Sequence, residues 1–157
     1  SVMSELIILA STGTMVGIAK PILPDVREFM RGTVALMEEL LPYCAFGIQL
    51  PVTKLLINCM EYDNLSVETL AEVKAIVEDK RYSAHADKIH IDLLETCIYD
   101  LTVYVLGHVK GVPVHRLEKN TRRKSDSAFT SMYQLACELF PEWKTNFDAL
   151  ANAGGEE

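Results

Sequence analysis

Mostly apolar side chains recur at alternating steps of three and four residues along the stretch from Tyr82 to Gly111. This spacing is typical of a helix that packs against other helices. The positions on the stripe are Ala84, Asp87, Ile91, Leu94, Ile98, Leu101, Val105 and His108. Apolar residues at 89, 93 and 97 widen the stripe, so such a helix needs cover on more than one side. The sequence therefore predicts a central helix at about 83–109, with Leu94, Ile98 and Leu101 nearly fully buried.

Helical spacing also marks the segments on either side of this helix. Further helices are predicted, in chain order, at 2–20, 25–41, 52–60 and 66–80. A last helix is expected to be capped by Ser125 or Asp126 and to kink or restart at Pro141. Together these helices predict an all-α fold, a helical bundle of five or six helices around the central one. The bundle would form a single domain at 1–151, followed by a disordered tail at 152–157.

Two details of this assignment bear on the fold. Gly13 and Gly17 form a small-residue pair that would let the first helix pack closely on another. In the helix at 52–60, the core positions would be Val52, Leu55, Leu56, Cys59 and Met60. The alternative for the N-terminal part is a buried strand at 6–10. We disfavour that strand because no later stretch supplies enough convincing strands to complete a sheet.

The composition fits one globular domain, and the charge narrows the choice of partner. The chain has 157 residues, is 49% hydrophobic and carries a net charge of −7. An acidic chain is a poor non-specific binder of nucleic acid, because the phosphate backbone attracts basic surfaces. The cysteines at 44, 59, 97 and 137 are widely spaced, which predicts buried free thiols in a reducing compartment. The uncharged run at 6–19 is too short to span a bilayer, so we expect a cytoplasmic protein without a transmembrane segment.

Metal chemistry is weakly indicated. Asp87, His90, Asp92 and Glu95 would place carboxylates and an imidazole on neighbouring helical turns. A di-iron bundle needs paired Glu-x-x-His motifs on two helices, and Asp87-x-x-His90 is a single imperfect copy. Solvated helix charges explain these residues better, so the sequence predicts no metal site and no cofactor.

Catalytic motifs are also absent from the sequence. It contains no Gly-x-Ser-x-Gly, no P-loop and no His-Glu-x-x-His. Histidine phosphotransfer is kept as an alternative function, on the segment from His108 to Gly111. That segment is one residue short of the His-x-x-Lys-Gly pattern, so its lysine would not lie one turn beyond the histidine. The sequence therefore predicts that the protein is not an enzyme.

The segment 112–125 reverses the charge of the chain locally and is the most informative polar feature. We predict that its basic side chains contact a partner, at Arg116, Lys119, Arg122, Arg123 and Lys124. A cationic patch of this kind attracts an anionic surface. Ser125 ends an Arg-Arg-x-Ser sequence typical of basophilic kinase sites, which makes it a candidate regulatory phosphorylation site. The alternative is a solvated loop without a binding function, whose charges offset acidic helix ends.

The apolar residues of the chain are thus explained by helix packing, and the sequence shows no assembled catalytic motif. We interpret it as a non-enzymatic protein-interaction or scaffold module that presents an apolar groove or helix face and a basic loop. Its partner would be a protein with an acidic surface. The alternative is an RNA-binding, nucleoprotein-like helical domain that uses the basic loop at 115–124. That loop lacks the aromatic residues on which unpaired bases stack, so nucleic acid is the less favoured partner.

Overall fold

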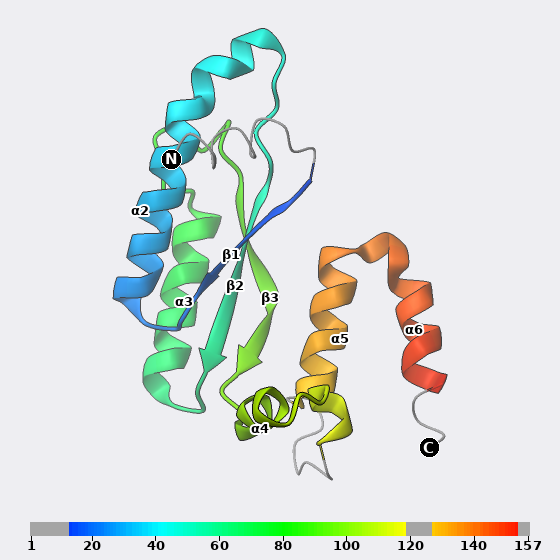
Figure 1. Ribbon diagram of the computed structural model, residues 1–157. Helices are drawn as coiled ribbons and strands as arrows, with labels where there is room; N and C mark the ends of the chain where they lie inside the picture. The colour runs from blue at the N-terminus through cyan, green and yellow to red at the C-terminus, as the bar shows by residue number, and fades with distance from the viewer. Residues whose placement is uncertain (1–12, 119–126, 154–157) are drawn as a thin grey trace. The chain divides into compact units, whose positions relative to one another are not determined.

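The structure is a computed structural model that describes residues 13–118 and 127–153 (Figure 1). Within these ranges, three strands form one sheet: β1 (Met15–Ala19), β2 (Thr53–Met60) and β3 (Ile91–Tyr99). The helices are α2 (Leu23–Leu40), α3 (Asn64–Glu78), α4 (Thr102–Lys110), α5 (Ala128–Leu139) and α6 (Lys144–Ala153). Short 3-10 segments are η1 (Leu41–Phe46), η2 (Val114–Arg116) and η4 (Pro141–Trp143). The fold is therefore α/β, and the prediction of an all-α helical bundle is wrong.

The three strands run parallel in the order β1-β2-β3. Met15 lies opposite Thr53 and Ala19 opposite Ile57 in the parallel register of β1 and β2. At the start of β2, the Thr53 amide donates to the His90 carbonyl (2.9 Å), and at its end the Asp100 amide donates to the Met60 carbonyl (3.0 Å). The starts and the ends of β2 and β3 thus coincide. Two successive strand–helix–strand crossovers, through α2 and α3, build the sheet.

One face of β1 lies against α2. A Cβ at Gly17 would overlap with the Phe29 ring, so glycine is required for this close approach. Residues opposite each other in the register share a face of the sheet, which places Leu55 and Ile57 on the same side as Gly17 and Ala19. Leu55 and Ile57 are fully buried. The core of this part of the chain therefore lies between the sheet and its helices, and Figure 1 shows α2 and α3 on the same side of the strands.

The predicted helices at 2–20 and 52–60 are wrong where the structure describes them, because residues 15–19 and 53–60 form strands. Residues 1–12, including the alternative strand at 6–10, lie outside the described residues. Burial alternates along β1 with the period of two that a strand requires. In 52–60, a short apolar run bounded by Pro51 and a polar turn is equally typical of a buried strand in a parallel sheet. The close packing expected at Gly17 is present, but it joins a strand to a helix.

The predicted central helix at 83–109 is wrong as well, since β3 and α4 occupy most of that range. Leu94 and Ile98 are buried as predicted, whereas Leu101 is only half-buried. The spacing of four between Leu94 and Ile98 puts both side chains on one face of a helix and also on one face of a strand. Their burial therefore could not distinguish the two structures. The β-branched residues at 89, 91, 96 and 98 favour the strand.

The helices at 25–41 and 66–80 are confirmed as α2 and α3, with ends that differ by about two residues. Pro24 occupies the first turn of α2, where its missing amide costs no hydrogen bond. The buried side of α2 repeats at steps of three and four, through Val26, Met30, Val34, Met37 and Leu40. This stripe is the amphipathic pattern of a helix that covers one face of a sheet.

The N-terminus of α3 is capped by Asp63, and not by Ser66, the residue at which the predicted helix at 66–80 begins. Its carboxylate accepts a hydrogen bond of 2.7 Å from the Ser66 amide, and the contacts with Ser66 hold the pKa of Asp63 below its ordinary value. A carboxyl group with a lowered pKa in the folded state stabilises the fold above its unfolded pKa. This stabilisation is lost as the pH falls through the lowered folded value.

Replacing Asp63 with alanine should therefore lower the melting temperature at neutral pH and leave it nearly unchanged at strongly acidic pH. The Asp63→Asn variant is the matched control, because asparagine caps a helix about as well as aspartate without titrating. The measurement is thermal unfolding followed by circular dichroism across the acidic range. An equal loss for Asp63→Ala at every pH would show that the carboxylate charge does not contribute to the cap.

The strands β2 and β3 each carry one irregularity, near the end of β2 and near the start of β3. In β2, Cys59 has a left-handed backbone with φ of 56°, which is costly for a residue with a Cβ. In β3, burial shifts phase between Ile91 and Leu94. The chain divides at these points into two compact units, Ser1–Asn58 with Tyr62–Leu93 and Cys59–Glu61 with Leu94–Glu157. We call them the first and the second unit.

In the second unit, α5 begins at Ala128 and is capped by Ser127, not by the expected Ser125 or Asp126. The hydroxyl oxygen of Ser127 accepts a hydrogen bond of 3.0 Å from the Thr130 amide. The Glu118 carboxylate accepts two more, from the amides of Ala128 (2.6 Å) and Phe129 (3.1 Å). These contacts satisfy amides that a helix leaves without an internal partner. The predicted restart at Pro141 is confirmed, since η4 and then α6 follow α5.

Candidate functional site

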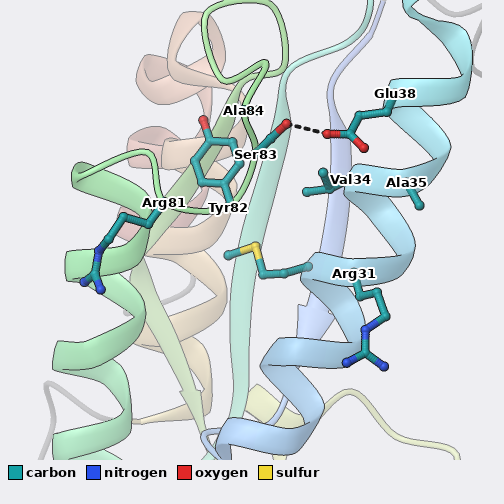
Figure 2. Close-up of a pocket in the computed structure, with 9 residues that line it drawn as sticks. Arg31, Val34, Ala35, Glu38, Arg81, Tyr82, Ser83 and Ala84 are labelled. Atoms are coloured by element: carbon teal, nitrogen blue, oxygen red, sulfur yellow. Dashed lines mark hydrogen bonds between the residues drawn. The ribbon is translucent and has the colours of Figure 1, made fainter.

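A groove of about 500 Å³ opens in the first unit between α2 and the segment that follows α3. One wall is formed by α2 side chains from Met30 to Glu38, and the other by residues 81–84 (Figure 2). Met30 and Val34 are buried core residues, so the floor of the groove belongs to the packed interior. Tyr82 is held at its place by a hydrogen bond of 3.1 Å from its hydroxyl group to the Ile89 carbonyl. The groove therefore has an apolar floor with fixed side chains.

A hydrogen bond connects the two walls of the groove. The Ser83 hydroxyl donates a hydrogen bond of 2.6 Å to the Glu38 carboxylate. The same hydroxyl oxygen accepts a hydrogen bond of 3.0 Å from the His85 amide. Figure 2 shows this hydrogen bond beside the Tyr82 side chain. Because Ser83 is anchored by the backbone of its own segment, it fixes the orientation of a carboxylate that comes from α2.

Arg31 and Arg81 also line the groove, one from each wall, and Figure 2 shows their guanidinium groups pointing away from each other. Arg31 makes an exposed ion pair with Glu28 one turn away (3.2 Å). Arg81 makes an exposed ion pair with Asp79 (3.2 Å). Exposed pairs of this kind contribute only about 0–1 kcal/mol, so both guanidinium groups can exchange these partners for another anion at low cost. Of the charged groups that line the groove, the Glu38 carboxylate is thus the one that makes a contact between the two walls.

The second unit presents a different kind of surface, on the outer side of α4. Val105, Leu106 and Val109 fall on one arc of this helix, and their side chains are 61%, 44% and 74% exposed. The opposite side of α4 packs on the segment that follows this helix, because a Cβ at Gly107 would lie 2.7 Å from the Val114 side chain. These three side chains form an apolar surface that no described residue of this unit covers. Such surfaces are typical of sites that bind another molecule.

Glu138 on α5 binds the backbone of β3 within the second unit. Its carboxylate oxygens accept hydrogen bonds from the Glu95 amide (2.6 Å) and the Thr96 amide (3.1 Å). Consecutive amides of a regular strand point to opposite sides, so both can reach one carboxylate only where the strand is distorted. Burial raises the pKa of the nearby Cys97 thiol, and the carboxylates of Glu138 and Glu95 raise this pKa further. This arrangement ties α5 to β3 and keeps the thiol protonated.

Of the predicted partner-binding residues, the structure describes only Arg116. Arg116 ends η2 and is exposed. Lys119, Arg122, Arg123, Lys124 and the regulatory candidate Ser125 lie outside the described residues. The start of α5 bears on the phosphorylation hypothesis, because Glu118 already accepts hydrogen bonds from its first amides. A phosphate at that helix terminus would have to displace this carboxylate.

The residues weighed for metal binding and phosphotransfer do not form a site in the described part of the chain. Asp87, His90, Asp92 and Glu95 are all exposed, and among the described residues no group of three or more His, Cys, Asp or Glu could hold a metal ion. His108 is exposed in the last turn of α4, not on the inward stripe. The four cysteines are free thiols as predicted, but each is partly exposed, so the prediction that they are buried is wrong.

Sequence reasoning missed the groove. Glu38 and Ser83 are 45 positions apart in the sequence, and neither belongs to a recognisable motif. The α4 surface could have been found, because Val105, Leu106 and Val109 remain apolar after β3 has ended. Val105 was instead assigned to the stripe of the central helix, and no role was assigned to Leu106 and Val109.

Comparison with protein-family models, with curated proteins and with solved structures gives no match for this chain. None of the helices in the described ranges combines the length and the apolar composition needed to cross a membrane. Proposals about function therefore start from the two surfaces described above.

Proposed function

We propose that the second unit is a protein-interaction module that binds an acidic amphipathic helix of another protein on the outer face of α4. The observation that supports this proposal is how little of its apolar surface is buried. Among residues 100–118 and 127–149, Ala128 is the only buried hydrophobic residue. The large side chains are instead exposed, on α4, at Phe129 and Met132 of α5 and around η4. A helical segment that buries so little of its own surface gains stability when a partner covers it.

The charge around α4 favours a partner with a negative charge. The segment 101–117 contains no aspartate or glutamate, although the chain as a whole carries a net charge of −7. His108, Lys110 and Arg116 lie in this segment, near the C-terminal end of α4 or after it. An apolar arc bordered by cations complements a helix whose own apolar face is bordered by carboxylates. An exposed valine or leucine that becomes fully buried contributes about 1.5–3 kcal/mol.

We place this function in the cytoplasm. The four free thiols support a reducing compartment, where unpaired cysteines persist.

The test uses a designed helical peptide with leucines at steps of three and four, flanked by glutamates and labelled for fluorescence anisotropy. We expect it to bind the intact chain more tightly than the same peptide with lysines in place of the glutamates. The double variant Val105→Ser with Val109→Ser should weaken binding of the acidic peptide about tenfold or more, because both valines would lose their burial. Lys110→Gln should reduce the dependence of this binding on salt.

Val67→Ser is the matched control, because Val67 is an exposed valine on α3 of the first unit. It should leave peptide binding unchanged. Equal binding of the acidic and the lysine peptides would overturn the assignment of an acidic partner. Equal binding by the unmodified chain and the α4 double variant, with both folded by circular dichroism, would overturn the surface itself.

A further inference from the structure

We infer that the first unit forms a homodimer, in which the β1 strands of two copies of this chain pair antiparallel and join their sheets. This inference goes beyond the interaction proposed for α4 and does not depend on it. It concerns only β1 and α2 of the first unit, so it can hold or fail whatever the outcome at α4.

β1 is an edge strand of the sheet, because β2 is its only neighbour among the described strands. The Met15 amide donates to the Val52 carbonyl (3.0 Å), so the backbone groups of Met15 point toward β2. Backbone groups alternate in direction along a strand, and those of Val16 and Ile18 therefore point away from β2. No other described strand pairs with them. Amides and carbonyls at such an edge are a template for a further strand.

The residues of β1 do not protect this edge from pairing. Monomeric proteins usually protect an edge strand with charged side chains, proline or a bulge. Residues 13–19 contain no charged residue and no proline. Gly17 faces the Phe29 ring, so Val16 and Ile18 point to the opposite side of the sheet, where they are 40% and 62% exposed. An uncharged edge with exposed β-branched side chains favours the addition of a strand.

The edge is self-complementary, which favours a second copy of this chain as the partner. If two β1 strands run antiparallel about a two-fold axis at Gly17, Val16 of one copy lies opposite Ile18 of the other. These two residues can then exchange both of their backbone hydrogen bonds, and the axis repeats the pair. Their β-branched side chains also become cross-strand neighbours on one face of the joined sheet, a pairing that stabilises sheets.

A flank of α2 beside β1 fits the same two-fold arrangement. It consists of uncharged, half-buried or exposed residues at steps of three and four, namely Phe29, Gly32, Thr33 and Leu36. The flank lies on the β1 side of the helix, because the Phe29 ring lies against Gly17. Two copies of α2 would be about two strand spacings apart, roughly 10 Å. Helices pack against each other at about 8–10 Å, so the two flanks can touch.

Gly32 gives independent support for a helix contact at this flank. It lies in the interior of α2, where glycine lowers helix stability relative to alanine. A Cβ at Gly32 would meet no described atom within 4 Å, so packing within the described chain does not require a glycine here. The approach of a second α2 explains it, because the distance between two packed helices depends on the size of the side chains at the contact.

The experiment measures the association of the full chain by sedimentation velocity at concentrations from about 1 to 100 μM. We expect the unmodified chain to shift from monomer to dimer with rising concentration. Val16→Lys with Ile18→Lys, and Val16→Glu with Ile18→Glu, should each remain monomeric, because like charges then lie opposite each other. An equimolar mixture of these two variants should form a dimer again, since each lysine then lies opposite a glutamate. This recovery also shows that both variants are folded.

Leu65→Lys with Val67→Lys is the matched control. Both residues are exposed on α3 of the same unit, and the net charge changes as much as in the β1 lysine variant. The control should dimerise like the unmodified chain. Gly32→Gln tests the α2 flank separately: it should raise the Kd of the dimer about tenfold or more. Glutamine is a better helix former than glycine, so this variant should melt at no lower temperature as a monomer.

Hydrogen exchange identifies the strand at the interface. The amides of residues 16 and 18 should exchange slowly in the dimer and quickly in the monomeric lysine variant. A chain that stays monomeric up to about 100 μM would overturn the inference, whether these amides exchange quickly or are protected by the chain itself. A dimer that persists in both charged variants, or that the α3 control loses to the same extent, would overturn the β1 interface.

Discussion

Replacing Ile57 with alanine should lower the free energy of unfolding by about 2–5 kcal/mol, the range for large-to-small changes in a packed core. Ile57 is 0% exposed on the central strand β2, opposite Ala19, and lies on the side of the sheet that α2 covers. Removing most of this side chain loses its transfer free energy and leaves a cavity that the sheet cannot close. The measurement is denaturant unfolding of the intact chain, followed by far-ultraviolet circular dichroism.

Val52→Ala is the matched control, and it makes the experiment a test of the fold. Val52 is 36% exposed and precedes β2, so its truncation should cost less than about 1 kcal/mol. A helix at 52–60 predicts the reverse order, because Val52 belongs to its core stripe and Ile57 does not. A larger loss for Val52→Ala than for Ile57→Ala would therefore contradict the parallel sheet.

The sequence analysis failed where a spacing is shared by helices and strands. Leu94 and Ile98 are separated by four residues, which is close to one helical turn and is also two repeats of a strand. Buried strands of a parallel sheet are covered on both faces, so they show continuous apolar runs and little alternation. The run at 53–60 is of this kind. Length and flanking residues were the remaining signals, since Pro51 and the polar turn at 61–64 leave room for about eight residues, short for a helix.

The helices were predicted well where caps and prolines add to the periodicity. The restart predicted at Pro141 is confirmed between α5 and α6, and Pro24 lies in the first turn of α2, close to the predicted start at 25. Cap positions were less accurate, because several serines and aspartates near each terminus are equally suitable in sequence. Asp63 was chosen over Ser66, and Ser127 over the two residues before it, by the path of the chain that enters each helix.

The groove could not have been derived from local patterns. It depends on a contact between Glu38 and Ser83. Glu38 precedes β2 in the sequence and Ser83 follows α3, and the two crossover connections bring them together. Once α2 is read as a helix, Arg31 and Glu38 are seven positions apart and fall on the same face, two turns from each other. That spacing is common on solvated helices. Only the position of residues 81–84 turns it into one wall of a groove.

Replacing Glu138 with alanine should lower the free energy of unfolding by about 1.5–3 kcal/mol, the range for hydrogen bonds to a charged group. Its carboxylate is the acceptor for the amides of Glu95 and Thr96, at 2.6 Å and 3.1 Å. The Thr96 side chain is buried, so water replaces the lost acceptor poorly at that amide. Glu142→Ala is the matched control, because Glu142 is exposed on the neighbouring η4, and it should change stability by less than about 0.5 kcal/mol.

A second readout separates the hydrogen bonds from the charge. Glu138→Gln keeps one carbonyl oxygen as an acceptor, so it should cost less stability than Glu138→Ala. It also removes a negative charge that raises the pKa of Cys97, so that pKa should fall toward its ordinary value. At a fixed pH below the thiol pKa, more thiolate is then present, and Cys97 should react faster with iodoacetamide. Unchanged stability in Glu138→Ala together with an unchanged pH profile of Cys97 in Glu138→Gln would show that this carboxylate does not bind β3 in solution.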